Sequence, residues 1–217
     1  MTTPQIAIAD RRRRALIQKW VNDPLWTLVQ VENAEMLHGK IHDLSGYTEA
    51  STGRLAPHRA RSVIMIEGSR DRDQTWSVWV RAGFTNYRCA YRAFVQHAYG
   101  IANVDNAWVG YQIDHLSNKA HAPTGDEFIR IEAIPEFANQ RWGVNFESRR
   151  TQNTYGRPSH RLSYMSCAKL AGLPPPTGPQ DTAGINLLVD FFKSLGLDPQ
   201  TAQDGVANML LHAYWRR

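Results

Sequence analysis

The sequence predicts an α+β fold in which a small mixed or antiparallel sheet is packed by helices and followed by a C-terminal helical hairpin. Three observations carry this prediction: short runs with strand chemistry, one segment with clear helical spacing, and two apolar helical segments after a proline-rich stretch. The chain has 217 residues, 42% of them hydrophobic, which is enough for one full core. We expect a main domain at 1–173, a proline-rich linker at 174–181 and the hairpin at 182–217.

The first quarter of the chain is predicted to hold one helix, one strand and a loop-rich connection. A helix capped by Asp10 should run to about Asn22, where Asp-Pro stops it. Its four consecutive arginines at 11–14 are typical of a solvated helix face, with phosphate contact as the alternative. A strand is expected at 25–31, and repeated glycines break any regular pattern at 35–57.

A hairpin and the clearest helix come next. Segments 62–67 and 74–81 are expected to pair around a polar turn, and apolar residues recur at helical spacing over 86–99. Arg88 and Arg92 fall one turn apart on the polar side of that helix. They form either a solvated face or a phosphate-facing pair.

Two further strands are predicted, at 108–113 and 128–134. The second alternates apolar residues with Arg130 and Glu132, so we expect one of its faces to be wet. A helix capped by a serine should then run over 159–170. The apolar faces of the two C-terminal helices must be buried on the main domain or on a second copy of the chain.

Composition and charge restrict the class of partner. The net charge of +5 comes mostly from arginine, which favours a polyanion. The cysteines at 89 and 167 lie far apart and match no metal spacing, so we expect reduced thiols. No segment is long and apolar enough to cross a bilayer, and the N-terminus lacks a secretory pattern. We therefore expect a cytoplasmic protein without membrane contact.

A basic, polar stretch at 147–157 carries Arg149, Arg150 and Arg157 around a tyrosine. Basic residues interleaved with an aromatic are the composition of a nucleic-acid-contacting loop. The same composition is equally typical of a surface loop.

The end of the strand at 108–113 is the most informative point, because apolar residues there give way abruptly to Asp114 and His115. A strand fixes the backbone, and the following loop can present polar side chains into a cleft. The same pair is equally typical of a turn or a helix cap. Asn139 follows in a later loop, and His160 follows at the expected start of a helix.

In this order the residues resemble the HNH, or ββα-metal, nucleases over about 111–168. The resemblance implies that His115 is the general base and that Asn139 orients the site. It also implies that Asp114 and His160 bind a divalent metal ion, Mg²⁺ or Mn²⁺, with Zn²⁺ as the alternative. The gaps between these residues are wider than in the compact motif, and the cysteine pairs that often brace such nucleases are absent.

The predicted function is therefore metal-dependent hydrolysis of phosphodiesters in nucleic acid, with DNA preferred to RNA as the partner. The predicted nucleic-acid contacts are Arg88, Arg92, Arg149, Arg150 and Arg157. Two alternatives stay open. One is a non-catalytic DNA- or RNA-binding accessory protein of a mobile element, and the other is an interaction module that forms a homodimer through its C-terminal helices.

Overall fold

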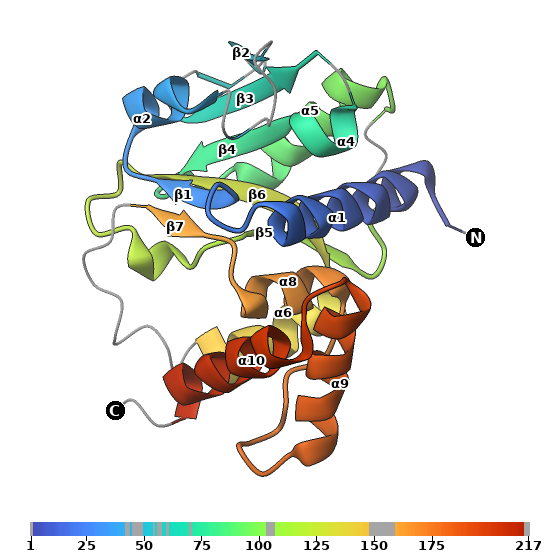
Figure 1. Cartoon of the computed structure of the whole chain (residues 1–217). Helices are drawn as coiled ribbons and strands as arrows, with labels where there is room; N and C mark the ends of the chain where they lie inside the picture. The colour runs from blue at the N-terminus through green and yellow to red at the C-terminus, as the bar shows by residue number, and fades with distance from the viewer. Residues whose placement is uncertain are drawn as a thin grey trace.

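A curled antiparallel sheet forms the upper half of the computed structural model, and a group of helices forms the lower half (Figure 1). The structure describes residues 2–41, 44, 50–53, 55, 58–59, 61–69, 71–102, 107–147 and 159–214. Within these residues seven strands pair in the order β2-β3-β4-β6-β1-β7, and β5 pairs with the second half of β6. The strands are β1 (Leu28–Val31), β2 (Ala50–Gly53), β3 (Val63–Gly68), β4 (Ser77–Arg81), β5 (Tyr111–His115), β6 (Phe128–Pro135) and β7 (His160–Arg161).

The helices flank the sheet and fill the lower half. They are α1 (Pro4–Asn22), α2 (Ala34–Gly39), α4 (Arg72–Thr75), α5 (Tyr87–Tyr99), α6 (Glu136–Trp142), α8 (Tyr164–Ala171), α9 (Thr182–Ser194) and α10 (Pro199–Tyr214). A 3₁₀ turn spans Lys119–His121, and a π-helical turn spans Gly143–Glu147. The predicted α+β class is confirmed. The segment 35–57, expected to be loop-rich, contains α2 and β2.

The N-terminal helix is capped by Thr3, seven residues before the predicted cap at Asp10. The hydroxyl of Thr3 accepts a hydrogen bond from the Ile6 amide at 3.3 Å, and Pro4 occupies the first turn. Both features are favourable helix starts, because proline has no amide to leave unpaired and threonine satisfies one that would be. The prediction that Asp10 caps the helix was wrong for this reason.

Three hydrophobic clusters hold the elements together, and α1 joins two of them. One cluster packs α5 against the sheet, and its α5 members are Ala90, Tyr91, Phe94, Val95 and Ala98. The other face of β3 and β4 packs with α2, and Trp79 is fully buried there. The largest cluster contains residues of α1, α6, α8, α9 and α10. Ile8 belongs to the α5 cluster and Leu16 to the largest one, so α1 ties the two halves together.

The C-terminal helices bury their apolar faces on the main body. Phe192 of α9 lies 5.8 Å from the ring of Trp20 and 4.7 Å from that of Tyr164. α10 approaches α8 closely at Gly205, because a Cβ atom there would lie 2.1 Å from the ring of Tyr164. These contacts place the hairpin in the same core as the N-terminal helix.

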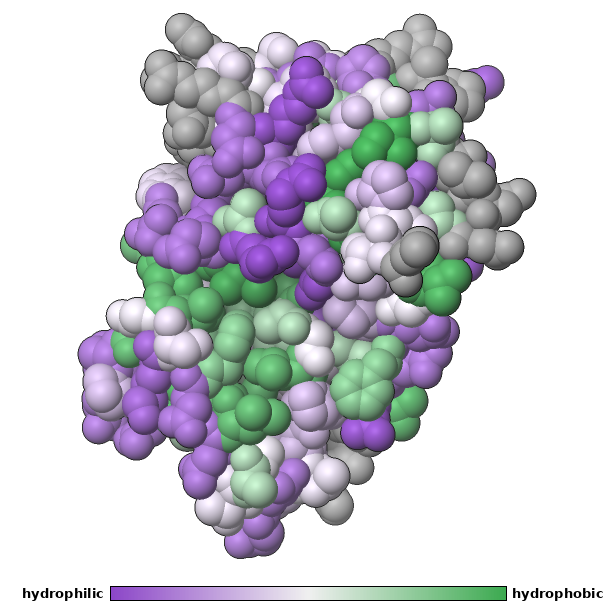
Figure 2. Space-filling model, turned by 90° about the vertical axis from the view of Figure 1, so that its right-hand side faces the viewer, coloured by the Kyte–Doolittle hydropathy of each residue, from purple (hydrophilic) through white to green (hydrophobic). Residues whose placement is uncertain are grey.

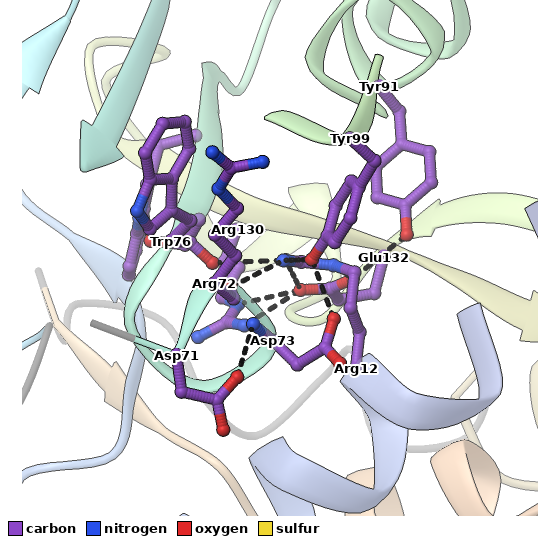
Figure 3. A network of polar contacts seen from close by, with 11 residues as sticks. Arg12, Asp71, Arg72, Asp73, Trp76, Tyr91, Tyr99, Arg130 and Glu132 are labelled. Atoms are coloured by element: carbon purple, nitrogen blue, oxygen red, sulfur yellow. Dashed lines mark hydrogen bonds and ion pairs between the residues drawn. The ribbon is translucent and has the colours of Figure 1, made fainter. Parts of the chain in front are cut away.

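The strand β6 has no wet face at Arg130 and Glu132, contrary to the prediction. Their exposed fractions are 3% and 0%, and Arg12 of α1 is also 0% exposed. Arg12 donates to both carboxylate oxygens of Glu132, at 2.6 and 3.1 Å, and Arg130 donates to the same carboxylate at 2.7 Å. Tyr91 of α5 adds a hydroxyl bond at 3.1 Å (Figure 3). In the arginine run at 11–14, Arg11 and Arg14 are exposed as expected, whereas Arg12 and Arg13 are buried.

In this buried network, two guanidinium groups share the carboxylate of Glu132. Burial alone would raise the pKa of Glu132, but the charges of Arg12 and Arg130 outweigh it and hold the pKa below its usual value. Tyr99 accepts a bond from Arg12 at 3.2 Å and donates to Asp73 at 2.7 Å, which extends the network to α4. The network joins α1, α4, α5 and β6 at the point where the two hydrophobic clusters meet.

The helices of the described residues include none with the length and apolar character needed to span a membrane.

Candidate functional site

Asp114 and His115 lie within β5, as its last two residues, and do not follow the strand as predicted. They pair with Glu132 and Ile131 of β6 in an antiparallel register. Successive residues of a strand point to opposite faces, so the two side chains leave the sheet on different sides. Asp114 faces α8, and His115 faces α5.

Asp114 is paired with a cation that no local pattern in the sequence predicts. Lys169 of α8 donates to its carboxylate at 3.3 Å, across 55 residues of sequence. Burial raises the pKa of Asp114, but the neighbouring His115 and the charge of Lys169 outweigh burial and bring the pKa to about 2. The carboxylate, which is 29% exposed, is therefore ionised at neutral pH.

His115 is a neutral, enclosed imidazole. Its ring lies 4.4 Å from the ring of Tyr87, at the start of α5, and only 6% of the residue is exposed. Burial lowers its pKa, and the opposing effect of Asp114, whose Oδ1 lies 3.8 Å from Nδ1, does not restore it. Nε2 is buried and has no hydrogen-bond partner among the described residues. A neutral imidazole with an unbonded nitrogen can act as a proton acceptor.

Two cations contact the ring of Tyr87, which packs against His115. The ammonium of Lys119 lies 4.8 Å from the centre of its ring, and the guanidinium of Arg88 lies 5.4 Å from it. Cations at these distances are attracted to the electron-rich ring face. Arg92, predicted to accompany Arg88, is half-buried, and its Nε has no partner in the part of the chain that the structure describes.

Asn139 lies on α6 and not in a loop. Its Nδ2 donates at 2.8 Å to Oε1 of Gln112, which shares a face of β5 with Asp114. Its Oδ1 is buried and lacks a partner among the described residues. Asn139 thus contacts the face of β5 that carries Asp114, at Gln112, two positions before Asp114.

His160 starts β7 and not a helix, because α8 begins at Tyr164 with Ser163 as its cap. It pairs with Gln30 of β1, and its ring stacks on that of His121 at 5.1 Å. The two imidazoles line a small pocket of about 60 Å³, whose other lining residues include Ser117, Ser163 and Ser166.

The metal assignment finds no support in this arrangement. Among the residues that the structure describes, no group of three or more His, Cys, Asp or Glu side chains is arranged to hold a metal ion. Asp114 is paired with Lys169, and a cation at that carboxylate opposes a metal ion electrostatically. Metal binding by Asp114 and His160 stays a prediction. Arg149, Arg150 and Arg157 lie outside the described residues.

Exposed cations gather where several strands end. At the end of β4, the amide of Arg81 donates to the carbonyl of Ser62 at 2.9 Å, so Arg61, the residue before Ser62, lies close to Arg81. On the other side of β4, Arg81 pairs with Phe128, the first residue of β6. Leu116, next to His115, lines the same pocket as Arg161. We call this surface the basic strand end and define it by its exposed cations, Arg61, Arg81, Arg88, Lys119 and Arg161. Among the described residues, its exposed acids are Glu32, which follows β1, and Asp126, which is paired with Arg81.

Sequence reasoning found Arg88 and the Asp114–His115 pair but missed Tyr87, Lys119 and Lys169. Lys119 follows His115 by four residues, and proximity in sequence was a usable signal for it. Lys169 had no such signal, because only the packing of α8 on β5 brings it to Asp114.

No protein-family model matches this sequence, and searches among curated proteins and solved structures found no match either.

Proposed function

We propose that this chain binds nucleic acid through the basic strand end. The observation that carries the proposal is that five exposed cations lie at or beside the ends of neighbouring strands and that two of them, Arg88 and Lys119, rest against the ring of Tyr87. Each cation near a phosphate releases condensed counterions, and this release supplies most of the affinity of sequence-independent binding. The two exposed acids leave the surface positive.

Tyr87 favours phosphate binding by two of these cations. Because Arg88 and Lys119 rest against its ring, they lose less side-chain freedom when they meet a phosphate. The cytoplasmic location expected from the sequence would give the surface access to nucleic acid.

The test is fluorescence anisotropy with labelled single- and double-stranded DNA and RNA across a salt series. We expect the double variant Arg88→Gln/Lys119→Gln to weaken binding about tenfold at low salt and to reduce the salt slope by about two phosphate contacts. Arg88→Gln alone should give about half of that change in slope.

Lys193→Gln is the matched control, since it removes an exposed charge from α9, outside the basic strand end. If Lys193→Gln lost as much affinity as Arg88→Gln, binding would depend on net charge alone, which contradicts the proposed surface. Absence of binding to any of the four nucleic acids at low salt would contradict nucleic-acid binding altogether.

A second candidate function, phosphodiester hydrolysis at the same place, is favoured by two specific observations. The order β5, β6, α6 is an antiparallel strand pair followed by a helix, the kind of element after which the ββα-metal nucleases are named. His115 is neutral, and its Nε2 is buried and unbonded among the described residues, so this nitrogen is free to accept a proton from a nucleophile that reaches it. The described residues do not form a metal site, so His115 is the only residue to which we assign a step here: accepting a proton from a nucleophile.

Cleavage of plasmid DNA and of structured RNA, with Mg²⁺, Mn²⁺ or EDTA, tests this second candidate. Cleavage that is lost in folded His115→Ala, while binding in the anisotropy assay is kept, supports hydrolysis. Intact substrate with every metal, together with normal binding, leaves nucleic-acid binding as the function and assigns His115 to packing against Tyr87.

A further inference from the structure

A groove of about 560 Å³ lies between α1, α8 and α9, on elements other than those that form the basic strand end. Its walls are apolar and consist of Ile17, Leu170, Ala171, Phe191 and Leu195. Its remaining lining residues are polar: Asp10, Arg13, Arg14, Gln18 and Tyr111. Figure 2 shows an apolar surface at the centre of the face on this side of the molecule, with a band of polar side chains above it.

The polar side of the groove carries two arginines and one carboxylate. Arg13 donates to Asp10, to the hydroxyl of Tyr111 and to the carbonyl of Leu170. Its Nε is buried and has no acceptor among the described residues. Arg14 is exposed, and its Nε donates to the carbonyl of Asp10 at 3.2 Å. Two cations against one carboxylate leave this side with a net positive charge.

We propose that this groove binds an amphipathic anion, a molecule with one carboxylate and an unbranched apolar chain. The chain lies against Phe191 and Leu195, and the carboxylate meets Arg14 in the positive field of the neighbouring Arg13. An arginine beside a carboxylate forms charge-assisted hydrogen bonds, which are stronger than neutral ones. The volume falls within the range of about 300–1,000 Å³ that is typical of small-molecule sites, and such sites combine apolar walls with few polar groups.

The two halves of the groove account for the choice of ligand. A neutral apolar molecule would leave the positive charge unmatched, and a small anion would leave the apolar walls in water. A cation with the same chain would be repelled by Arg13 and Arg14. The proposal does not depend on nucleic-acid binding, because none of the cations of the basic strand end lines the groove.

Isothermal titration calorimetry with hexanoate, octanoate and decanoate tests the apolar walls. Each added methylene should tighten binding about fourfold until the groove is full. Octylamine should not bind measurably, and octanol should bind about tenfold more weakly than octanoate. Equal affinity of octanoate and octylamine would overturn the charge assignment, and the absence of octanoate binding would overturn the site.

Two variants, each with a matched control, place the ligand. Arg14→Gln should weaken octanoate binding about tenfold without changing that of octanol, whereas Arg11→Gln, an exposed arginine of the same helix that does not line the groove, should change neither. Ala171→Trp should fill the groove and abolish binding, whereas Ala183→Trp, on an exposed position of α9, should not. Circular dichroism confirms that the variants are folded. Octanoate binding that survives in folded Ala171→Trp would overturn the location.

Discussion

Two carboxylates that face each other across one strand pair have different environments. Asp114 of β5 and Glu132 of β6 are paired in register and lie on the same face of the sheet. Glu132 is completely buried and accepts bonds from Arg12, Arg130 and Tyr91. Asp114 is 29% exposed and has one lysine at 3.3 Å.

The difference shows how a protein separates charges that hold a fold from charges that remain accessible. A fully buried carboxylate is tolerated only when several donors replace the lost water, and those donors here come from α1, α5 and β6. A partly exposed carboxylate needs fewer partners, so its surroundings can change without loss of the fold. Glu132 belongs to the first kind and Asp114 to the second.

The largest expected effect comes from breaking the buried cluster. Glu132→Gln leaves Arg12 and Arg130 buried without a counter-charge, and we expect it to lower the free energy of unfolding by about 3–5 kcal/mol. Urea denaturation followed by circular dichroism measures this loss. The matched control, Asp190→Asn, removes an exposed carboxylate that is paired with Lys193 and should change stability by less than about 0.5 kcal/mol.

A loss below about 1 kcal/mol for Glu132→Gln would mean that water reaches the two arginines, and the distinction between the two carboxylates would fail.

Acid should affect Asp114 in a defined pH window. Its pKa is about 2, below the usual value of 3.8, so its stabilising contribution is present above pH 4 and is lost as the pH falls through 2. Asp114→Asn should therefore be less stable than the native chain by about 2 kcal/mol at pH 7. This gap should stay constant down to about pH 4 and shrink below it. Thermal unfolding of both proteins from pH 7 to pH 3 measures the gap.

A gap that is already closing at pH 6 would instead assign the effect to His115. Glu132 also loses stabilising charge in acid, because its pKa lies below the usual value, but it does so in both proteins and cancels from the difference.

The surroundings of these residues show which features could be predicted from the sequence and which could not. Strand pairing, the helix α5 and the apolar C-terminal helices follow from local periodicity, and the structure contains each of them. The polar residues of β6 were expected to face water because polarity is also a local property. Glu132 is buried because Arg12 lies beside it, 120 positions away in sequence, and no local pattern encodes that pairing.

The candidate site shows the same limit. The Asp114–His115 pair and Arg88 could be found from residue type and position. His160 was placed at a helix start because Ser159 resembled a cap, but Ser163 caps α8, and the intervening residues form β7. Tyr87 and Lys169 became recognisable only when α5 and α8 packed on opposite faces of β5.

The smallest expected effect is a change in proton affinity without unfolding. Lys169→Met removes a positive charge near His115, and that charge lowers the pKa of the imidazole, so the pKa should rise. Lys119→Met should also raise it, because Lys119 lowers the pKa of His115 from the side of Tyr87. Nuclear magnetic resonance titration of the imidazole Cε1–H signal measures both shifts, and Lys193→Met, on α9, should leave the pKa unchanged.

If neither Lys169→Met nor Lys119→Met changes the pKa of His115, burial alone determines that pKa. The neighbouring charges then have no effect on the protonation of His115. A rise in both variants means that His115 takes up its proton at a higher pH and adds a positive charge to the basic strand end. Nucleic-acid affinity at pH 6 should then fall less in Lys119→Met than the loss of one lysine predicts. Neighbouring charges would thus adjust the protonation of the His115 end of the strand pair, whereas a substitution in the network around Glu132 can only destabilise the fold.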